Sequence, residues 1–83
     1  MKTSVEVSMY PLTKQYKTPI LDFINRLNQH AGLTVKTNSM STQIFGNYDE
    51  VMSAVTKEIK VSFEKDPTVI MVMKVLNIDV SQP

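Results

Sequence analysis

The chain has 83 residues, of which 42% are hydrophobic and 20% charged, with a formal net charge of +1; this length suits one domain, residues 1–83. Lys and Arg are interspersed with Asp and Glu, so no basic run can follow a phosphate backbone and nucleic acid is not an expected partner. The absence of cysteine excludes disulfides and thiolate sites, and no apolar run approaches the roughly 20 residues that a membrane helix needs.

The first predicted element is a strand from Thr3 to Tyr10. Val5, Val7 and Met9 alternate with polar residues, which is the period of a half-buried strand. Pro11 cannot donate a ladder hydrogen bond, so the strand should end there.

The acidic residue Glu6 interrupts the start of the chain before the apolar segment of a secretory signal can develop. Together with the absence of cysteine and of a membrane span, this leads us to expect a cytoplasmic protein.

A helix is predicted from Pro19 to about Ala31. Thr18 can cap its first N–H groups, and proline suits the first helical position. Gly32 supplies a left-handed stop. Apolar residues recur every three or four positions and form one stripe, made of Ile20, Phe23, Ile24, Leu27 and Ala31.

Two short antiparallel strands are predicted next, from Leu33 to Asn38 and from Thr42 to Phe45, joined by a turn at residues 39–41. Asn47 and Glu50 have the spacing of a capping box and mark the start of a second helix, which Asp66-Pro67 ends. Its core stripe is expected to contain Met52, Val55, Ile59 and Phe63.

The last predicted strand, from Thr68 to about Ile78, is apolar on both faces. The order of the predicted elements is strand, helix, strand, strand, helix, strand. With right-handed crossovers, this order predicts an α+β, ferredoxin-like βαββαβ fold. Its four-stranded antiparallel sheet should have both helices on one face. The last strand should lie at an edge, beside the first.

One sheet face should therefore remain open. Under the helices we expect Val5, Val7, Met9, Val35, Ile44, Val69, Met71, Met73 and Val75. On the open face we expect Glu6, Ser8, Tyr10, Lys36, Gln43, Phe45, Ile70, Val72, Lys74 and Leu76, with Glu6 paired to Lys74 across adjacent strands. This face is too apolar for solvent, so we expect a homodimer or homotetramer through it.

Groups suited to catalysis are scarce. His30 is the lone histidine, at the end of the first helix, with no carboxylate obviously placed to orient it. Asp49 and Glu50 are explained by their place in the first turn of the second helix. An enzyme would need a titratable group between helices and sheet, and the predicted inner face offers none. We expect no catalysis, no cofactor and no metal site.

Six neutral hydroxyl or amide side chains surround the predicted turn, from Thr37 to Gln43. Turn chemistry alone accounts well for Asn38 and Ser39 and less well for Thr37, Ser41 and Thr42. The alternative is a polar ligand site, for which Met40 is a further contact candidate because it lies in the turn rather than on a core stripe.

At these positions the chain resembles the YkoF-like family that binds thiamine and hydroxymethylpyrimidine. The matching segments are residues 7–13 (VSMYPLT), residues 37–46 (TNSMSTQIFG) and residues 48–51 (YDEV). The resemblance covers nearly the whole chain. It implies a small-molecule binder that supports thiamine salvage or uptake without chemistry.

The resemblance also implies contacts and an assembly. Tyr10 would stack against a flat ring, and Thr37, Ser41 and Thr42 would form hydrogen bonds with an aminopyrimidine. The full set of expected ligand-binding residues is Ser8, Tyr10, Thr37, Asn38, Met40, Ser41 and Thr42. Asn38 stands where the related motif often has Asp, so a negative charge is missing there.

The resemblance implies that members of the YkoF type carry the module twice, whereas this chain has one copy, so a dimer would replace the tandem arrangement. Single-module relatives look like homo-oligomers built through their sheets. The alternative function is a homo-oligomeric interaction or regulatory module without a small-molecule ligand.

Overall fold

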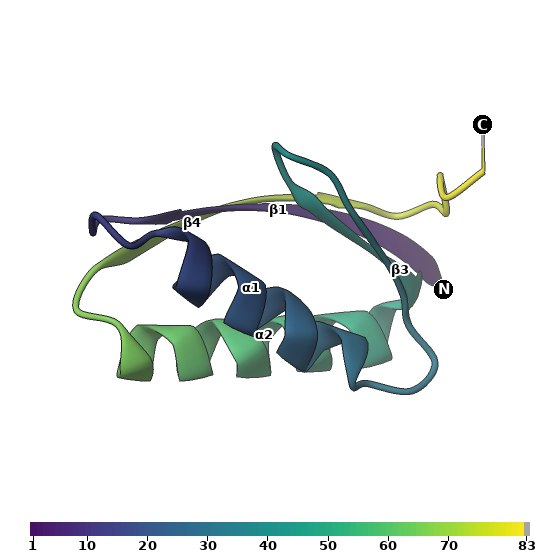
Figure 1. Ribbon diagram of the computed structural model, residues 1–83. Coiled ribbons are helices and arrows are strands. Elements are labelled where there is room, and N and C mark those ends of the chain that lie inside the picture. The colour runs from purple at the N-terminus through teal and green to yellow at the C-terminus, as the bar shows by residue number, and fades with distance from the viewer. Residues whose placement is uncertain (83) are drawn as a thin grey trace.

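The computed structural model describes residues 1–82, so Pro83 of the predicted domain lies outside the described residues (Figure 1). The elements follow the predicted order. They are β1 (Lys2–Pro11), α1 (Lys17–Asn28), β2 (Thr34–Thr37), β3 (Thr42–Asn47), α2 (Tyr48–Lys65) and β4 (Val69–Leu76).

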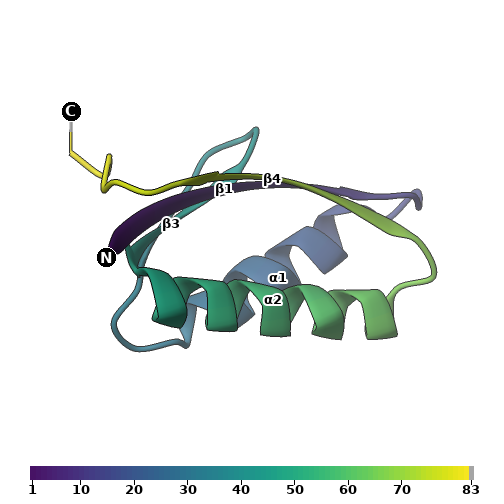
Figure 2. The same cartoon turned by 180° about the vertical axis from the view of Figure 1, so that it is seen from behind.

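The four strands form one antiparallel sheet in the order β2-β3-β1-β4. Both helices lie on the same side of it, as the two opposite views show (Figures 1 and 2). This confirms the α+β ferredoxin-like fold, and β4 lies at an edge beside β1 as predicted. Val5 of β1 is paired with Ile44 of β3 on one side and with Val75 of β4 on the other. These three side chains therefore lie in one row on the same face of the sheet.

The core lies between the helices and this face. Its fully buried members are Val5, Val7, Phe23, Leu27, Ile44, Val51 and Val55. Met9, Val35 and Met71, which were predicted on the same face, are partly buried against them. Apolar alternation in β1 and β3 therefore located the core correctly.

The prediction that the helices cover Met73 and Val75 of β4 was wrong. Val75 is 46% exposed and Met73 is 37% exposed, although both are on the face that the helices cover. Of the two helices α2 packs near β4, but β4 lies at the edge of the sheet, where the helices cover it only in part. Much of β4 is thus accessible on both faces.

The prediction was also wrong for Phe45, which is on the open face but is only 4% exposed. The residues after β4 turn back over this face. The Ser4 hydroxyl donates a hydrogen bond to the Ile78 carbonyl (2.7 Å) and accepts one from the Val80 N–H (3.0 Å), and Lys36 Nζ donates to the Ser81 carbonyl (2.6 Å). We call residues 77–82 the tail; it covers one end of the open face.

The predicted helix caps did not form. α1 begins at Lys17, with Tyr16 at the N-cap position, so Thr18 lies inside the helix. Asn47 is the N-cap residue of α2, but its side chain makes no capping hydrogen bond. Gly32 has the predicted positive φ of +83°, although α1 already ends at Asn28.

Phe63, predicted in the core, is 51% exposed. The buried residues of α2 are Val51, Ala54, Val55, Glu58 and Ser62. This stripe contains two polar residues, and it places Phe63 to one side. Among residues 1–82, neither helix is long and apolar enough to cross a membrane.

Candidate functional site

A cavity of about 230 Å³ lies between the start of α1 and the hairpin that joins β2 to β3. We call it the hairpin cavity. It is lined by Val7, Met9, Tyr10, Tyr16, Ile20, Phe23, Ile24, Thr37, Asn38, Ser39, Met40, Ser41 and Thr42. The cavity is smaller than the roughly 300–1,000 Å³ of pockets for drug-sized ligands, so its size suits a single ring.

Two threonines of the hairpin provide free hydroxyls. Thr37 and Thr42 face each other across β2 and β3, and Thr42 also faces Val7 of β1. Thr42 is only 5% exposed and its hydroxyl makes no side-chain hydrogen bond within residues 1–82. No fully buried side-chain oxygen in that range lacks a hydrogen-bond partner. The Thr42 hydroxyl is therefore accessible to a small molecule, and Thr42 lines the hairpin cavity.

Asn38 and Ser41 are largely engaged by other protein groups. Asn38 Oδ1 accepts hydrogen bonds from the backbone N–H groups of Met40 (2.8 Å) and Ser41 (3.0 Å), which is turn chemistry. The Ser41 hydroxyl donates to Glu6 Oε2 at 2.9 Å, toward the open face. Met40 is exposed at the tip of the hairpin.

The apolar wall of the cavity comes from α1 and the residue before it. Ile20, Phe23 and Ile24 were predicted only as core residues, and Tyr16 fell in a segment predicted to be a loop. Because α1 begins earlier than expected, Tyr16 lies at its N-cap and borders the cavity. Only the apolar stripe gave a sequence signal for this wall.

Six of the seven expected ligand-binding residues therefore line one cavity. Ser8 does not: it shares the open face with Glu6, because successive residues of a strand point to opposite faces. Tyr10, at the end of β1, borders the cavity and is half exposed, although strand alternation predicted it on the open face together with Ser8.

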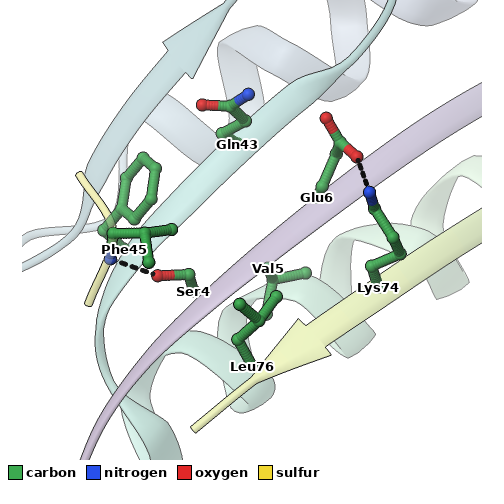
Figure 3. A pocket seen from close by; sticks show the side chains of 8 residues that line it. Ser4, Val5, Glu6, Gln43, Phe45, Lys74 and Leu76 are labelled. Carbon is green, nitrogen blue, oxygen red and sulfur yellow. Dashed lines mark hydrogen bonds and ion pairs between the residues drawn. The ribbon is translucent and has the colours of Figure 1, made fainter. Parts of the chain in front are cut away.

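A second cavity, of about 290 Å³, lies on the open face and is bounded by Phe45, Leu76 and Val80 of the tail (Figure 3). Its polar groups already have partners within the chain. Glu6 accepts hydrogen bonds from Ser41 (2.9 Å) and pairs with Lys74 (3.1 Å) as predicted. The hydrogen bond from Ser41 and then the charge and hydrogen bond of Lys74 hold the pKa of Glu6 below its ordinary value.

Since the groups in this second cavity satisfy one another, the hairpin cavity is the better candidate site.

His30 does have a carboxylate partner, contrary to the sequence prediction. Its Nε2 lies 2.6 Å from Glu58 Oε2, and Glu58 also accepts a hydrogen bond from Arg26 Nη1 at 2.8 Å. Arg26 lies in α1, His30 just after its end and Glu58 in α2, so these contacts join the two helices. This cluster shares no residue with the hairpin cavity.

The hairpin cavity thus combines aromatic and aliphatic walls with hydroxyl groups that can donate or accept. No carboxylate, imidazole, ammonium or guanidinium group is among its lining residues. Such a surface can hold a flat, polar, uncharged ring. General acid–base chemistry needs a positioned titratable group, and these walls offer only the phenols of Tyr10 and Tyr16.

The family described as thiamine-binding protein matches residues 5–79 of the chain. The chain belongs to the thiamine-binding protein family. This match includes both strands that flank the hairpin cavity, α1 and the hairpin itself. The family is one of binders, which agrees with a thiamine-related function.

Solved structures share the fold of this thiamine-binding family member. A protein of Methanocaldococcus jannaschii superposes with a TM-score of 0.81 at 23% identity, covering 98% of this chain and 84% of that one. A Streptococcus pneumoniae protein has a TM-score of 0.80 at 20% identity, covering 96% and 90%.

A Thermotoga maritima protein, proposed to act in thiamine biosynthesis or salvage, has a TM-score of 0.79 at 14% identity, covering 90% and 82%. At these identities the likeness concerns the fold alone. A search of curated proteins found no match.

Proposed function

We propose that the chain is a cytoplasmic, non-enzymatic binder of thiamine or of its hydroxymethylpyrimidine precursor, and that it supports salvage or uptake. The observation that carries this proposal is the gathering of Tyr10, Thr37 and Thr42 around one uncharged cavity in a chain of the thiamine-binding protein family. The YkoF-like resemblance of the hairpin supports the pyrimidine as the recognised part.

In this proposal the aminopyrimidine ring enters the hairpin cavity. Tyr10, Tyr16 and Phe23 pack against the ring, while Thr37 and Thr42 exchange hydrogen bonds with its nitrogen atoms and amino group. The cavity is small, so the second ring of thiamine would remain outside the opening.

Titration calorimetry with thiamine and with hydroxymethylpyrimidine tests the proposal. We expect heat with at least one of them, and a roughly tenfold loss of affinity in Thr42→Val, because a buried ligand group without its partner costs about 1–3 kcal/mol. Thr34→Val is the matched control, since Thr34 is an exposed strand residue that does not line the cavity. No heat with either compound at millimolar concentration would reject the binder.

A second function is favoured by a different observation. Ile70 and Val72 are exposed beside each other on the open face of β4, and Leu76 is exposed beyond Lys74, which fits a homodimer or homotetramer paired through that face. An interaction or regulatory module without a ligand would need only this face. It predicts no binding heat and no effect of Thr42→Val on function.

A further inference from the structure

The hairpin cavity contains no formal charge. Its thirteen lining residues are apolar, hydroxyl, phenol, thioether or amide side chains. Glu6 is the nearest acid in the hydrogen-bond network, but it lies on the opposite face of the sheet, where Ser41 and Lys74 hold it.

The charged groups around the cavity are mostly basic. Lys14 and Lys17 flank Tyr16 and line a separate depression with it. On α1, Asp22 is engaged by Arg26 (3.0 Å) and by Lys65 (3.1 Å). None of the residues that line the cavity is an acid, and Glu6 and Asp22 are both engaged by basic side chains.

This distribution matters because an aminopyrimidine exists in two forms. Its ring nitrogen is neutral at high pH and carries a proton, and thus a positive charge, at low pH. A buried charge without a partner costs several kcal/mol, whereas the neutral ring needs only hydrogen bonds. The hydroxyls of Thr37 and Thr42 can supply these as donors or acceptors.

We propose that the hairpin cavity selects the neutral form of its ring ligand and keeps any charged substituent outside, because no residue of its wall carries a formal charge. The inference rests on the proposed function and adds to it the charge state of the bound ring.

Asn38 can be tested by a change that keeps its structural role. Its Oδ1 accepts two backbone hydrogen bonds, from Met40 and Ser41, and an Asp carboxylate can accept the same two. Asn38→Asp therefore keeps the turn while it adds a negative charge to the cavity wall. Asn77→Asp, beyond the opposite end of the sheet from the cavity, is the matched control with the same change in net charge.

The experiment is titration calorimetry of the full chain with hydroxymethylpyrimidine across the ligand's own pKa, within the pH range where circular dichroism shows a folded protein. For the wild type and Asn77→Asp we expect constant affinity above that pKa and a fall of about tenfold per pH unit below it. In Asn38→Asp this fall should be abolished or reversed.

A second probe makes the test independent of pH. An aminopyrimidine methylated at its ring nitrogen carries a fixed positive charge, so at pH 8 it should bind Asn38→Asp but not the wild type. An isomer methylated on carbon, which is neutral and equal in size, should still bind the wild type.

The outcomes separate the two proposals. Wild-type binding that is unchanged or strengthened when the ring is protonated overturns the charge selection and leaves the ligand proposal in place. If neither the neutral nor the charged ring gives heat at any pH, the ligand proposal fails and the charge selection fails with it.

Discussion

Glu58 shows how a charged residue can belong to the buried stripe of a helix. The guanidinium group of Arg26 donates to the Glu58 carbonyl and to its Oε1, both at 2.8 Å, and to the Ser62 hydroxyl at 2.6 Å. His30 approaches the second carboxylate oxygen of Glu58 at 2.6 Å. The polar groups buried between the helices thus satisfy one another, as buried polar groups generally must.

These contacts set the ionisation of Glu58. Burial by itself raises the pKa of its carboxyl, but the hydrogen bonds from His30 and Arg26 and their charges outweigh it, so the pKa lies below its ordinary value. A carboxyl with a lowered folded-state pKa stabilises the fold above its unfolded-state pKa. That stabilisation is lost as the pH falls through the folded-state pKa.

We therefore expect Glu58→Gln to destabilise the protein by roughly 1–3 kcal/mol at pH 7, because it leaves the charge of Arg26 only partly compensated. The difference in the free energy of unfolding between Glu58→Gln and wild type should shrink as the pH falls below the ordinary pKa range of a glutamate, because the wild type then loses the same ion pair. Urea denaturation at pH 7 and at acidic pH measures both values.

Glu64→Gln is the control for this prediction, since Glu64 is exposed near the end of α2 and its replacement should change stability little. A deficit that stays constant down to the lowest pH at which the protein folds would contradict the role of the ion pair.

At this scale the sequence predicted an ion pair between neighbouring strands and missed a contact between the two helices. The Glu6–Lys74 pair followed from strand order, because the first and last strands had to be neighbours. The partnership of His30 with Glu58 depends on how α1 and α2 are rotated against each other. No residue pattern within either helix encodes that rotation.

The tail illustrates the scale of single elements. Its main attachment is Ser4, a buried hydroxyl in β1 that bonds two backbone groups of residues 78 and 80. Under the tail lies Phe45, with Val80 at the same cavity (Figure 3). A short segment outside the regular strands thus completes the cover of one aromatic side chain.

We expect Ser4→Ala to cost about 1–2 kcal/mol, because two partly buried backbone groups lose their partner. Hydrogen exchange at the Val80 amide should accelerate more than exchange at the amides of β1. Ser53→Ala, on the exposed side of α2, is the control. Unchanged protection at Val80 would show that the tail does not depend on Ser4.

The elements themselves were largely predictable, and their ends were not. Period-two alternation located β1 and β2, a run that is apolar on both faces located β4, and three-to-four spacing located both helices. The start of α1 was misplaced by two residues because Thr18-Pro19 has the chemistry of a cap that the chain does not use. Phe63 was placed in the core because Glu58 and Ser62 interrupt the apolar pattern of the face that is actually buried.

At the scale of the whole molecule, the exposed apolar side chains of β4 raise the question of assembly. If copies pair through the open face, Val72→Asp should convert the assembled protein to a monomer, because it places a charge in the apolar contact. Val72 is 53% exposed in the single chain, so the monomer itself should still fold. Size-exclusion chromatography with light scattering measures the mass.

Leu21→Asp places the same charge on an exposed leucine of α1 and should leave the assembly intact. A wild-type protein that is already monomeric would reject pairing through this face. Phe45, by contrast, is unsuitable for this test, because a charge beneath the tail would destabilise the fold itself.

The fold could be predicted from the sequence because element order and right-handed crossovers leave few topologies. For the candidate site, the sequence supplied the hairpin side through Thr37 and Thr42 and missed the α1 side, where Tyr16 and Phe23 border the cavity. Core residues and cavity-lining residues share one apolar stripe, so only the packing of α1 on the sheet distinguishes them.

The central place of β1 has a consequence for synthesis. This strand leaves the ribosome before the other five elements, yet its two neighbours, β3 and β4, are separated from it by one helix and by two. The apolar side chains of β1, and its backbone N–H and C=O groups that pair with β4, remain without partners until residues 69–76 have emerged. Such non-local pairing slows folding and leaves a nascent chain open to association with its neighbours. We therefore expect this chain to depend on chaperones mainly during its synthesis, when nascent chains on one polysome lie close together, and less once it has folded.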